Sequence, residues 1–515
     1  MAARVTLGQI ADRLRAEGLL KGERGLADRA AARPVPEAWT DSRRVKSGHL
    51  FCAVKGTETD GHRFLAEVSG KGAAGATVER RDHLISLPQI EVTDGRLAAA
   101  YAAACVYGDP WNELTVVGIT GTNGKTTSTA ILRHLLGRRA PAGSIGTLGA
   151  LDHEGKVIPG TEGLTTPGPT EVARWLRMYR DGLGGKPALD IAPVKVEAVA
   201  METSSHALAQ DRLAAVRFDA ALFTNLTRDH LDYHQTMDEY RAAKLRLLEL
   251  LKPAGAVVLN ADDPAWNGVG ASDRRIVRFS TSAPADVRAR DIRVGPGGME
   301  FVLSTPSGDT DVAIPLFGDF NVSNALGCAA VLYALGWSVG EITAGLATLP
   351  QVPGRLERVS GPPASATVLI DYAHTPDALE RAIAAIRPLV KGKLWVVFGA
   401  GGDRDQGKRP EMGRVAAERA DMSIVTSDNP RTENPEAILD AIESGMGRAP
   451  RLRVPDRREA IRHALLNAAQ DDVILLAGKG HETYQIVGKQ ARPFDERQVV
   501  REVLSERDEG SGGAG

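Results

Sequence analysis

Apolar runs of strand length alternate with longer amphipathic stretches through the middle of this sequence. Residues 114–119 and 196–201 are two such runs, and 220–223 and 255–259 continue the pattern. The amphipathic segments between them predict helices. Strands that alternate with helices are typical of a mostly parallel sheet with helices on its faces. The pattern therefore predicts an α/β fold for a central domain over residues 113–352.

A similar pattern resumes after a Val-Pro-Gly-Arg turn at 352–355. It predicts a Rossmann-like α/β domain over 353–505, with strands at these apolar runs: 367–370, 394–398, 422–425 and 473–476. Shorter runs at 50–54 and 74–78 predict a small α/β domain over residues 1–112, and residues 1–20 at its start predict an amphipathic helix. The polar, glycine-rich end, 506–515, predicts a disordered tail.

Composition narrows the class of protein. A chain of 515 residues is too long for one core, in agreement with three domains. The net charge of −2 argues against broad attraction to nucleic acid or anionic membranes, and no apolar run has the roughly 20 residues needed to span a bilayer. The three cysteines form no Cys-x-x-Cys pair, so neither structural zinc nor a disulfide framework is expected. These features predict a cytoplasmic protein.

The segment Gly-Thr-Asn-Gly-Lys-Thr-Thr at 121–127 lies between the strand candidate 114–119 and a helical segment, 128–136. A strand, a glycine-rich loop and a helix in this order bind triphosphates through backbone N–H groups and the helix N-terminus. Lys125 can reach the terminal phosphates, and the Thr126 hydroxyl can ligate Mg²⁺. Ile119 replaces the first glycine of the strict pattern, so the loop is a variant. We predict that it binds ATP through Gly121, Thr122, Asn123, Gly124, Lys125, Thr126 and Thr127.

Three other residues of the central domain are candidates for the same site. Glu202 directly follows the strand candidate 196–201, where a carboxylate suits Mg²⁺, although a solvated loop glutamate is the alternative. His230 follows the strand candidate 220–223 and is either a metal contact or a surface histidine. Lys244 lies on an otherwise apolar face of a helix predicted over 240–251. It either extends its ammonium to water or carries a carbamate that binds a cation.

The polar loops of the C-terminal domain combine arginine, lysine and carboxylates. They are Asp-Tyr-Ala-His at 371–374 and the loops at 399–405, 427–431 and 478–482. Because ligands bind outside the carboxyl ends of parallel strands, these loops predict one pocket for a substrate with both carboxylate and ammonium groups. Asn/Asp clusters at 259–263 and 318–324 either bind nucleotide or form turns.

Ordered motifs along nearly the whole chain resemble those of the Mur ligase family, ATP-dependent amide-forming enzymes of peptidoglycan precursor synthesis. The motifs are Asp-Ser-Arg at 41–43, the phosphate loop at 121–127, Thr-Thr-Pro at 165–167, Glu-x-Ser-Ser-His at 202–206, Thr-Asn-Leu-x-x-Asp-His at 224–230, Ala-Ala-Lys at 242–244, Pro-Gly-Arg-Leu-Glu at 353–357, Asp-Tyr-Ala-His at 371–374 and Gly-Gly-Asp-Arg-Asp at 401–405. The resemblance implies an N-terminal UDP-substrate-binding domain, a central ATPase domain and a C-terminal amino-acid-binding domain.

The resemblance also assigns residues. Lys125, Lys244 and His230 would be catalytic, Asn321 and Arg355 would contact the nucleotide, and Mg²⁺ would be held by Thr126, Glu202, His230 and Lys244 as its carbamate. The UDP-linked sugar-peptide would contact Thr40, Ser42, Thr57, Glu58, Thr59, Thr165, Thr166, Ser204, Gln210 and Arg212.

Asp-Asn-Pro-Arg at 428–431 is similar to the signature of family members that add meso-diaminopimelate to UDP-N-acetylmuramoyl-L-alanyl-D-glutamate. The diaminopimelate would then contact Arg404, Asp428, Asn429, Pro430, Arg431, Gly478 and Glu482. Alternatives are a ligase for lysine, a folate-polyglutamylating relative, which the Asp-Ser-Arg domain argues against, and a non-catalytic nucleotide switch or phosphate-loop ATPase. The expected partners are small molecules, with no nucleic acid or membrane insertion, and the expected state is a monomer.

Overall fold

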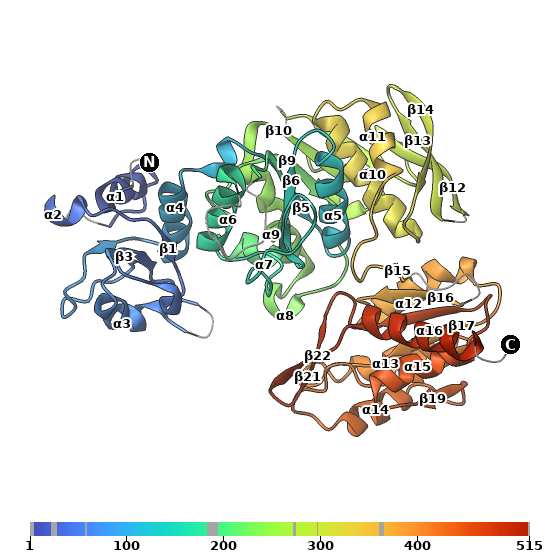
Figure 1. Ribbon diagram of the computed structural model, residues 1–515. Coiled ribbons are helices and arrows are strands. Elements are labelled where there is room, and N and C mark those ends of the chain that lie inside the picture. Colours follow the sequence, from blue (N-terminus) through green and yellow to red (C-terminus); the bar gives the residue numbers. More distant parts are fainter. Residues whose placement is uncertain are drawn as a thin grey trace. The chain divides into compact units, whose positions relative to one another are not determined.

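The computed structural model describes residues 5–21, 28–56, 59–182, 194–270, 274–295, 297–359 and 365–512. The chain divides into two compact units. The first holds residues 1–288, 304–309 and 324–345, and the second holds 289–303, 310–323 and 346–515. Successive stretches of the chain build three separate sheets with flanking helices, which confirms the α/β class (Figure 1).

A four-stranded parallel sheet lies at the start of the first unit. The predicted N-terminal amphipathic helix is confirmed: it is capped by Thr6 and Gln9 and buries Leu7, Ile10 and Leu14. The strands, in sheet order, are β1 (Ala38–Trp39), β2 (Leu50–Cys52), β3 (Gly75–Val78) and β4 (Gln89–Glu91). The helices are α1 (Leu7–Ala16), α2 (Asp28–Ala31), α3 (Leu65–Gly70) and α4 (Gly95–Tyr107).

Within the described ranges the central sheet has ten strands in the order β14-β13-β12-β11-β10-β9-β5-β8-β6-β7. Its strands are β5 (Thr115–Thr120), β6 (Ala142–Gly146), β7 (Gly149–Leu151), β8 (Ala198–Glu202), β9 (Phe218–Phe223), β10 (Leu251–Asn260), β11 (Ile276–Ser280), β12 (Val287–Gly295), β13 (Gly298–Thr305) and β14 (Gly308–Ile314). The helices are α5 (Lys125–Leu136), α6 (Pro169–Asp181), α7 (Ser205–Ala209), α8 (Leu231–His234), α9 (Met237–Leu245), α10 (Asp319–Ala334) and α11 (Val339–Leu346).

The four strands predicted for this region are confirmed as β5, β8, β9 and β10, which are parallel neighbours. The helix predicted over 240–251 is too long. It ends at Leu245, and a 3₁₀ turn over Arg246–Leu250 leads into β10. Pro253 favours an extended conformation for Lys252, in agreement with the start of β10 at Leu251.

The third sheet has the order β15-β16-β20-β17-β18-β19 and is parallel except for β15. Side chains alternate along it: Leu369 packs with α12–α14, whereas Val368 and Ile370 pack with α15 and α16. Helices therefore cover both faces, as predicted. The elements are β15 (Glu357–Val359), β16 (Thr367–Asp371), β17 (Leu394–Phe398), β18 (Met422–Val425), β19 (Arg451–Arg453), β20 (Val473–Ala477), α12 (Pro376–Ile386), α13 (Lys408–Arg419), α14 (Pro435–Glu443), α15 (Arg457–Asn467) and α16 (Glu496–Gly512), with a separate hairpin of β21 (Tyr484–Val487) and β22 (Gln490–Pro493).

The C-terminal helix α16 is joined to α15 by a fully buried ion pair. Nε of Arg457 lies 2.8 Å from Oε1 of Glu496, and Nη2 also donates to the carbonyl of Ala477 at 2.8 Å. The helix extends to Gly512, and the disordered tail predicted over 506–515 stays a prediction. An ion pair between Arg462 and Glu506 extends the packing of α16 into this segment. No helix in the described part of the chain is long and apolar enough to cross a membrane.

Candidate active site

The carboxyl ends of three parallel strands meet at one edge of the central sheet. Ile119 of β5 is in register with Glu202 of β8, and Thr120 of β5 is in register with Phe223 of β9. The segments that follow these strands, which include the phosphate loop (residues 121–127), therefore start side by side. Ligands of open α/β sheets bind at such an edge.

Two glycines allow the phosphate loop to approach its neighbours closely. Gly121 has φ 148°, and a Cβ there would lie 1.9 Å from Oγ1 of Thr224. Gly124 has φ 84°, and a Cβ there would lie 2.3 Å from Oδ1 of Asn324. Any larger residue would therefore clash at both positions, in addition to the strain of a positive φ.

The segment after β9 holds the first half of the phosphate loop. The N–H of Thr122 donates to the carbonyl of Asn225 at 2.7 Å, and the N–H of Asn123 donates to Oδ1 of Asn225 at 2.9 Å. Oγ1 of Thr224 donates to the carbonyl of Asn123 at 2.7 Å. Helix α5 begins at Lys125, and the N-terminus of a helix presents backbone N–H groups that suit phosphate.

Lys125 and Lys244 share an acceptor in the phosphate loop. Nζ of Lys125 donates to the carbonyls of Gly121 and Thr122 at 2.9 and 2.8 Å, and Nζ of Lys244 donates to the Gly121 carbonyl at 2.8 Å. Lys244 is only 1% exposed, so the interpretation that its ammonium reaches water is wrong. Its Nζ lies 4.3 Å from the centre of the Tyr240 ring. Burial, and then the Lys125 ammonium, hold the pKa of Lys244 well below its ordinary value.

Glu202 is a buried carboxylate, not a solvated loop residue. Its Oε1 accepts from the N–H of Thr147 at 2.9 Å, and its Oε2 accepts from the Thr147 hydroxyl at 3.1 Å. Gly146 permits this approach, because a Cβ there would lie 2.3 Å from Oε1 of Glu202. The strand end thus presents one fixed carboxylate close to the phosphate loop.

His230 lies in a group of aromatic rings after β9. It has φ 53°, and its ring centre is 4.8 Å from that of His206, which in turn lies 5.4 Å from that of His234. The His230 side chain is 44% exposed, and partial desolvation with the charges of Lys125 and Lys244 outweighs the opposing charge of Asp229. The pKa of His230 is therefore lowered, which favours the neutral imidazole. Among the residues that the structure describes, His, Cys, Asp and Glu side chains form no group of three or more suited to a metal ion.

A cavity of about 640 Å³ lies between the N-terminal sheet and the central sheet within the first unit. Thr40, Ser42, Thr59, Gln210 and Arg212, all predicted to contact the UDP-linked substrate, line it. Sequence reasoning missed three cations in the lining, Arg43, Lys55 and Arg96. The predicted contacts Thr57 and Glu58 lie outside the described residues.

Hydrogen bonds connect this cavity to the strand end of Glu202. Arg212 Nη1 donates to the carbonyl of Thr166 at 2.9 Å, and the Thr166 hydroxyl donates to the carbonyl of Glu202 at 2.8 Å. The N–H of Ser204 donates to the Thr166 hydroxyl at 3.0 Å. The hydroxyl oxygens of the predicted residue Thr165 and of Thr147 lie 3.1 Å apart, within hydrogen-bond distance. The structure therefore brings these predicted contacts together along one path.

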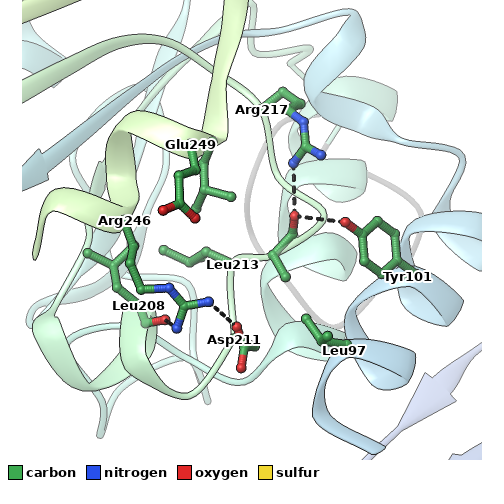
Figure 2. Close-up of a pocket in the computed structure, with 10 residues that line it drawn as sticks. Leu97, Tyr101, Leu208, Asp211, Leu213, Arg217, Arg246 and Glu249 are labelled. Carbon is green, nitrogen blue, oxygen red and sulfur yellow. Dashed lines mark hydrogen bonds and ion pairs between the residues drawn. The ribbon is translucent and has the colours of Figure 1, made fainter. Parts of the chain in front are cut away.

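A smaller cavity of about 230 Å³ is lined in part by the segment 208–214, which also carries Gln210 and Arg212 (Figure 2). Arg246 forms an ion pair with Asp211, which has φ 58°, and donates to the carbonyl of Leu208 at 2.7 Å. Arg217 donates to the carbonyl of Ala214 at 2.8 Å. These contacts fix both ends of the segment at the smaller cavity.

In the second unit, the loop after β18 (residues 428–431) forms a network with the loop after β20. Asn429 Nδ2 donates to Oε2 of Glu482 at 2.8 Å. Nζ of the fully buried Lys479 donates to Oδ1 of Asn429 and Oε2 of Glu482 at 3.2 and 3.1 Å. Gly478 has φ 117°, and a Cβ there would lie 2.4 Å from Oδ2 of Asp428. The predicted amino-acid contacts at 428–431, 478 and 482 therefore form one cluster.

Other predicted residues of the second unit have separate partners. Arg431 donates from Nη1 to the carbonyl of Gly402 at 2.9 Å, and Arg404 is exposed. Asn321 is buried in α10 and donates to the carbonyl of Phe317 at 2.8 Å. The guanidinium of Arg355 lies 5.2 Å from the centre of the Tyr372 ring.

Comparisons with known proteins agree with this geometry. The family models for the Mur ligase middle domain and the Mur ligase glutamate ligase domain match residues 119–332 and 354–480. Two curated relatives, from Gloeobacter violaceus and Geobacillus kaustophilus, are 43% and 44% identical, over 91% of this chain and 93% and 94% of their own lengths. Both are named UDP-N-acetylmuramoyl-L-alanyl-D-glutamate--2,6-diaminopimelate ligase.

The chain belongs to the Mur ligase family. A solved structure of a UDP-N-acetylmuramoyl-L-alanyl-D-glutamate--2,6-diaminopimelate ligase matches this Mur ligase with a TM-score of 0.68 and 28% identity, over 98% of this chain and all of that one. The MurF ligase from Thermotoga maritima in complex with ADP shares the fold, with a TM-score of 0.63 and 19% identity over 94% of this chain and all of that one.

Two residues of this Mur ligase that hold the site together were missed in the sequence. Thr147, which binds both oxygens of Glu202, lies in a short turn between β6 and β7 that carries no recognisable motif. Lys479 stands inside the Gly-Lys-Gly-His-Glu loop that was predicted to line the pocket, but nothing in the spacing indicates that it is buried.

Proposed function

We propose that this Mur ligase adds meso-diaminopimelate to UDP-N-acetylmuramoyl-L-alanyl-D-glutamate, with conversion of ATP to ADP and phosphate, as a cytoplasmic monomer in peptidoglycan precursor synthesis. The observation that carries the proposal is the pairing, in one chain, of the phosphate loop with the 428–431 loop that ends in Arg431. The names of relatives more than 40% identical over 91% of the chain support it.

The first step transfers a phosphoryl group. A γ-carboxylate oxygen of the D-glutamate attacks the γ-phosphorus of ATP, ADP leaves, and an acyl phosphate forms. Lys125 can exchange its bonds to the Gly121 and Thr122 carbonyls for bonds to the phosphates, where its charge stabilises the anionic transition state. The N–H groups at the start of α5 provide further donors.

The donors near the phosphate loop suit Mg²⁺ in part. Glu202 is a fixed carboxylate, and Thr126 and His230 add a hydroxyl and an imidazole. Lys244 fits only after modification, because an ammonium cannot ligate a cation. Its depressed pKa favours the neutral amine, which can add CO₂ to give an anionic carbamate. Mg²⁺ bound by these four residues would neutralise phosphate charge.

The 640 Å³ cavity of the first unit would receive the UDP-linked sugar-peptide. Ser42 and the cations Arg43, Lys55 and Arg96 provide contacts for the anionic nucleotide. From there the bonded path through Arg212 and Thr166 leads to Glu202. The peptide would follow this path, so that its free carboxylate comes to the phosphate loop.

The second step forms the amide bond. The amine of diaminopimelate, after loss of a proton, attacks the acyl carbon, and phosphate leaves. Arg431 would hold the distal carboxylate, and Asp428 and Glu482 would accept from the distal ammonium. Asn321 and Arg355 of the second unit would contact the nucleotide, and Arg404 would contact the amino acid.

A ligase for lysine is the second candidate, because lysine shares every group of diaminopimelate except the distal carboxylate. Arg431 favours diaminopimelate. With lysine, the guanidinium would lose the partner that its planar fork suits.

Release of ADP, measured with each substrate omitted in turn, tests the proposal. We expect full turnover only with ATP, the UDP-linked muropeptide and diaminopimelate together, and a product whose mass equals that of the muropeptide plus diaminopimelate minus water. Equal turnover with lysine would favour the second candidate. A rate of ATP hydrolysis that does not depend on either of the other two substrates would exclude a ligase.

A further inference from the structure

The hairpin of β21 and β22 stands apart from the six-stranded sheet of the second unit (Figure 1). Its two strands form a sheet of their own, with one isolated bridge from Val487 to Arg431, and its residues are exposed or half-buried. Isolated two-stranded hairpins are at best marginally stable in water. The hairpin therefore depends on contacts with the rest of the unit.

Those contacts concentrate on the 428–431 loop. Gln485 Nε2 donates to the carbonyl of Asp428 at 2.7 Å, and the N–H of Ile486 donates to Oδ1 of Asn429 at 2.9 Å. The N–H of Arg431 donates to the carbonyl of Ile486 at 3.0 Å, and the carbonyl of Arg431 accepts from Gly488 at 2.7 Å. Three of the four residues of the loop are thus held by the hairpin.

Arg431 has a backbone conformation that needs this support. Its φ of 50° lies in the left-handed region, which residues with a Cβ rarely adopt. Such conformations persist only where the surrounding structure fixes them, and they concentrate at functional sites. Here the two backbone bonds from Arg431 to the hairpin, made by its N–H and its carbonyl, fix the conformation. They also fix the direction in which the guanidinium leaves the loop.

Asn429, by contrast, has its side chain occupied by protein groups. Its Oδ1 accepts from Lys479 and from the N–H of Ile486, and its Nδ2 donates to Glu482. This amide therefore links the hairpin to the loop that carries Glu482. Arg431, Asp428 and Glu482 are the charged groups of this cluster that the proposed function assigns to the ligand. In the described part of the chain, Arg431 donates from Nη1 to Gly402 and Glu482 accepts at Oε2, which leaves Nη2 and Oε1 for a ligand.

We propose that the β21–β22 hairpin is the element that sets amino-acid specificity, with Gln485 as a positioning residue that holds the 428–431 loop and aims Arg431 at the distal carboxylate. This deepens the proposed function and rests on it. Gln485 does not touch the substrate. Without its bond to Asp428, the loop would sample positions in which Arg431 misses the carboxylate, so diaminopimelate would lose more binding than lysine, which has no such group.

Two variants of Gln485 and one control test the hairpin. Gln485→Ala removes the donor, and Gln485→Glu keeps the size but replaces the NH₂ donor with an acceptor. Gln490→Ala is the matched control, because Gln490 is an exposed glutamine on the other strand of the same hairpin. Each protein is assayed for kcat and KM with diaminopimelate, lysine, ATP and the muropeptide, and its melting temperature is recorded.

We expect both Gln485 variants to raise the KM for diaminopimelate roughly three- to tenfold, the factor of one part-buried hydrogen bond, and to lower the diaminopimelate-to-lysine preference similarly. The KM values for ATP and the muropeptide should stay within about twofold, since those ligands do not meet this loop in the proposed site, and Gln490→Ala should match the wild type.

An unchanged KM for diaminopimelate, or an equal rise in the KM of every substrate, would overturn the role of the hairpin and leave the proposed function intact. A wild type that does not ligate diaminopimelate at all would overturn both. If Gln485→Ala melts at a much lower temperature, the KM values of Gln485→Glu decide whether the hairpin has this role, because that variant preserves side-chain volume.

Discussion

The phosphate loop and the 428–431 loop both follow a parallel strand, yet they are held in different ways. The phosphate loop bends at Gly121 and Gly124, both with positive φ, and continues directly into α5. The 428–431 loop bends at Arg431, which has a side chain, and is held by bonds from β21 and Lys479, some 50 residues later in the chain.

This difference follows from the ligands. A triphosphate presents many equivalent oxygens, which backbone N–H groups and one lysine can bind whatever side chains stand around them. An amino acid must be distinguished from close analogues, and only side chains at fixed positions can do so. The phosphate loop accordingly carries its ligand-binding groups in a short local motif, although Thr224 and Asn225 hold its first half. The side chains of the amino-acid loop take their positions from segments that the chain brings together only on folding.

Lys125→Ala tests the phosphate side and should have the largest effect. We expect turnover to fall on the order of 10²–10³-fold, because a charge aimed at the transition state is lost. The melting temperature should stay within a few degrees of the wild type, since Lys125 lies in a loop and its Nζ donates to the carbonyls of Gly121 and Thr122 in that loop. Activity within a few-fold of the wild type, or a collapse of the fold, would be inconsistent with this role.

Lys244→Ala should be next. Loss of the carbamate would remove charge stabilisation from the transition state. We expect the activation free energy to rise by about 3 kcal/mol, which lowers turnover roughly 10²-fold. Formate or acetate at high concentration should restore part of the activity by supplying a carboxylate in the space of the side chain. Full activity of the variant without added acid would show that Lys244 only packs against Tyr240 and the Gly121 carbonyl.

Arg431→Ala tests the 428–431 loop, which is proposed to bind the amino acid. We expect kcat/KM with diaminopimelate to fall roughly thirtyfold, which corresponds to a loss of about 2 kcal/mol of transition-state binding. This is the low end for a charge pair in a binding site, because Arg431 is only half-buried. The preference over lysine should fall by the same factor, while the KM for ATP stays constant. An unchanged preference would mean that Arg431 serves only the turn.

The smallest effect is expected for Arg246→Met. This variant removes the ion pair with Asp211 and the bond to the Leu208 carbonyl, both in the segment that carries Gln210 and Arg212. We expect the KM for the muropeptide to rise roughly fivefold, which corresponds to a loss of about 1 kcal/mol of binding free energy, with kcat and the KM for ATP unchanged. Glu249→Gln is the control, because Glu249 lines the same small cavity. If both variants behave like the wild type, the segment does not need this support.

The local motifs of the sequence predicted the phosphate loop and the strands around it, because apolar runs and glycines act over a few residues. β6 was missed, since Ala-Gly-Ser-Ile-Gly has no apolar run. The hairpin over 484–493 was missed because its strands are exposed and show no buried face. The roles assigned to Asn321, Arg355 and Arg404 stay predictions.

The burial of Lys244 shows a further limit of sequence reasoning. A lysine on an apolar helical face fits two opposite interpretations, and only the surrounding chain decides between them. Here the phosphate loop covers the ammonium and offers the Gly121 carbonyl, a contact between residues 123 positions apart. Thr147 and Glu202, 55 positions apart, are a similar case.

The buried pair of Arg457 and Glu496 bears on the synthesis of the protein. A chain that stops before Glu496 leaves the buried Arg457 guanidinium without its carboxylate partner, while the Ala477 carbonyl still accepts from Nη2. An uncompensated buried charge costs about 3–5 kcal/mol, a large share of the roughly 5–15 kcal/mol that stabilises a typical domain. The ribosome must therefore reach the last helix before the second unit can resist proteases, and nascent or truncated chains should be digested in a pulse of protease that the full-length chain survives.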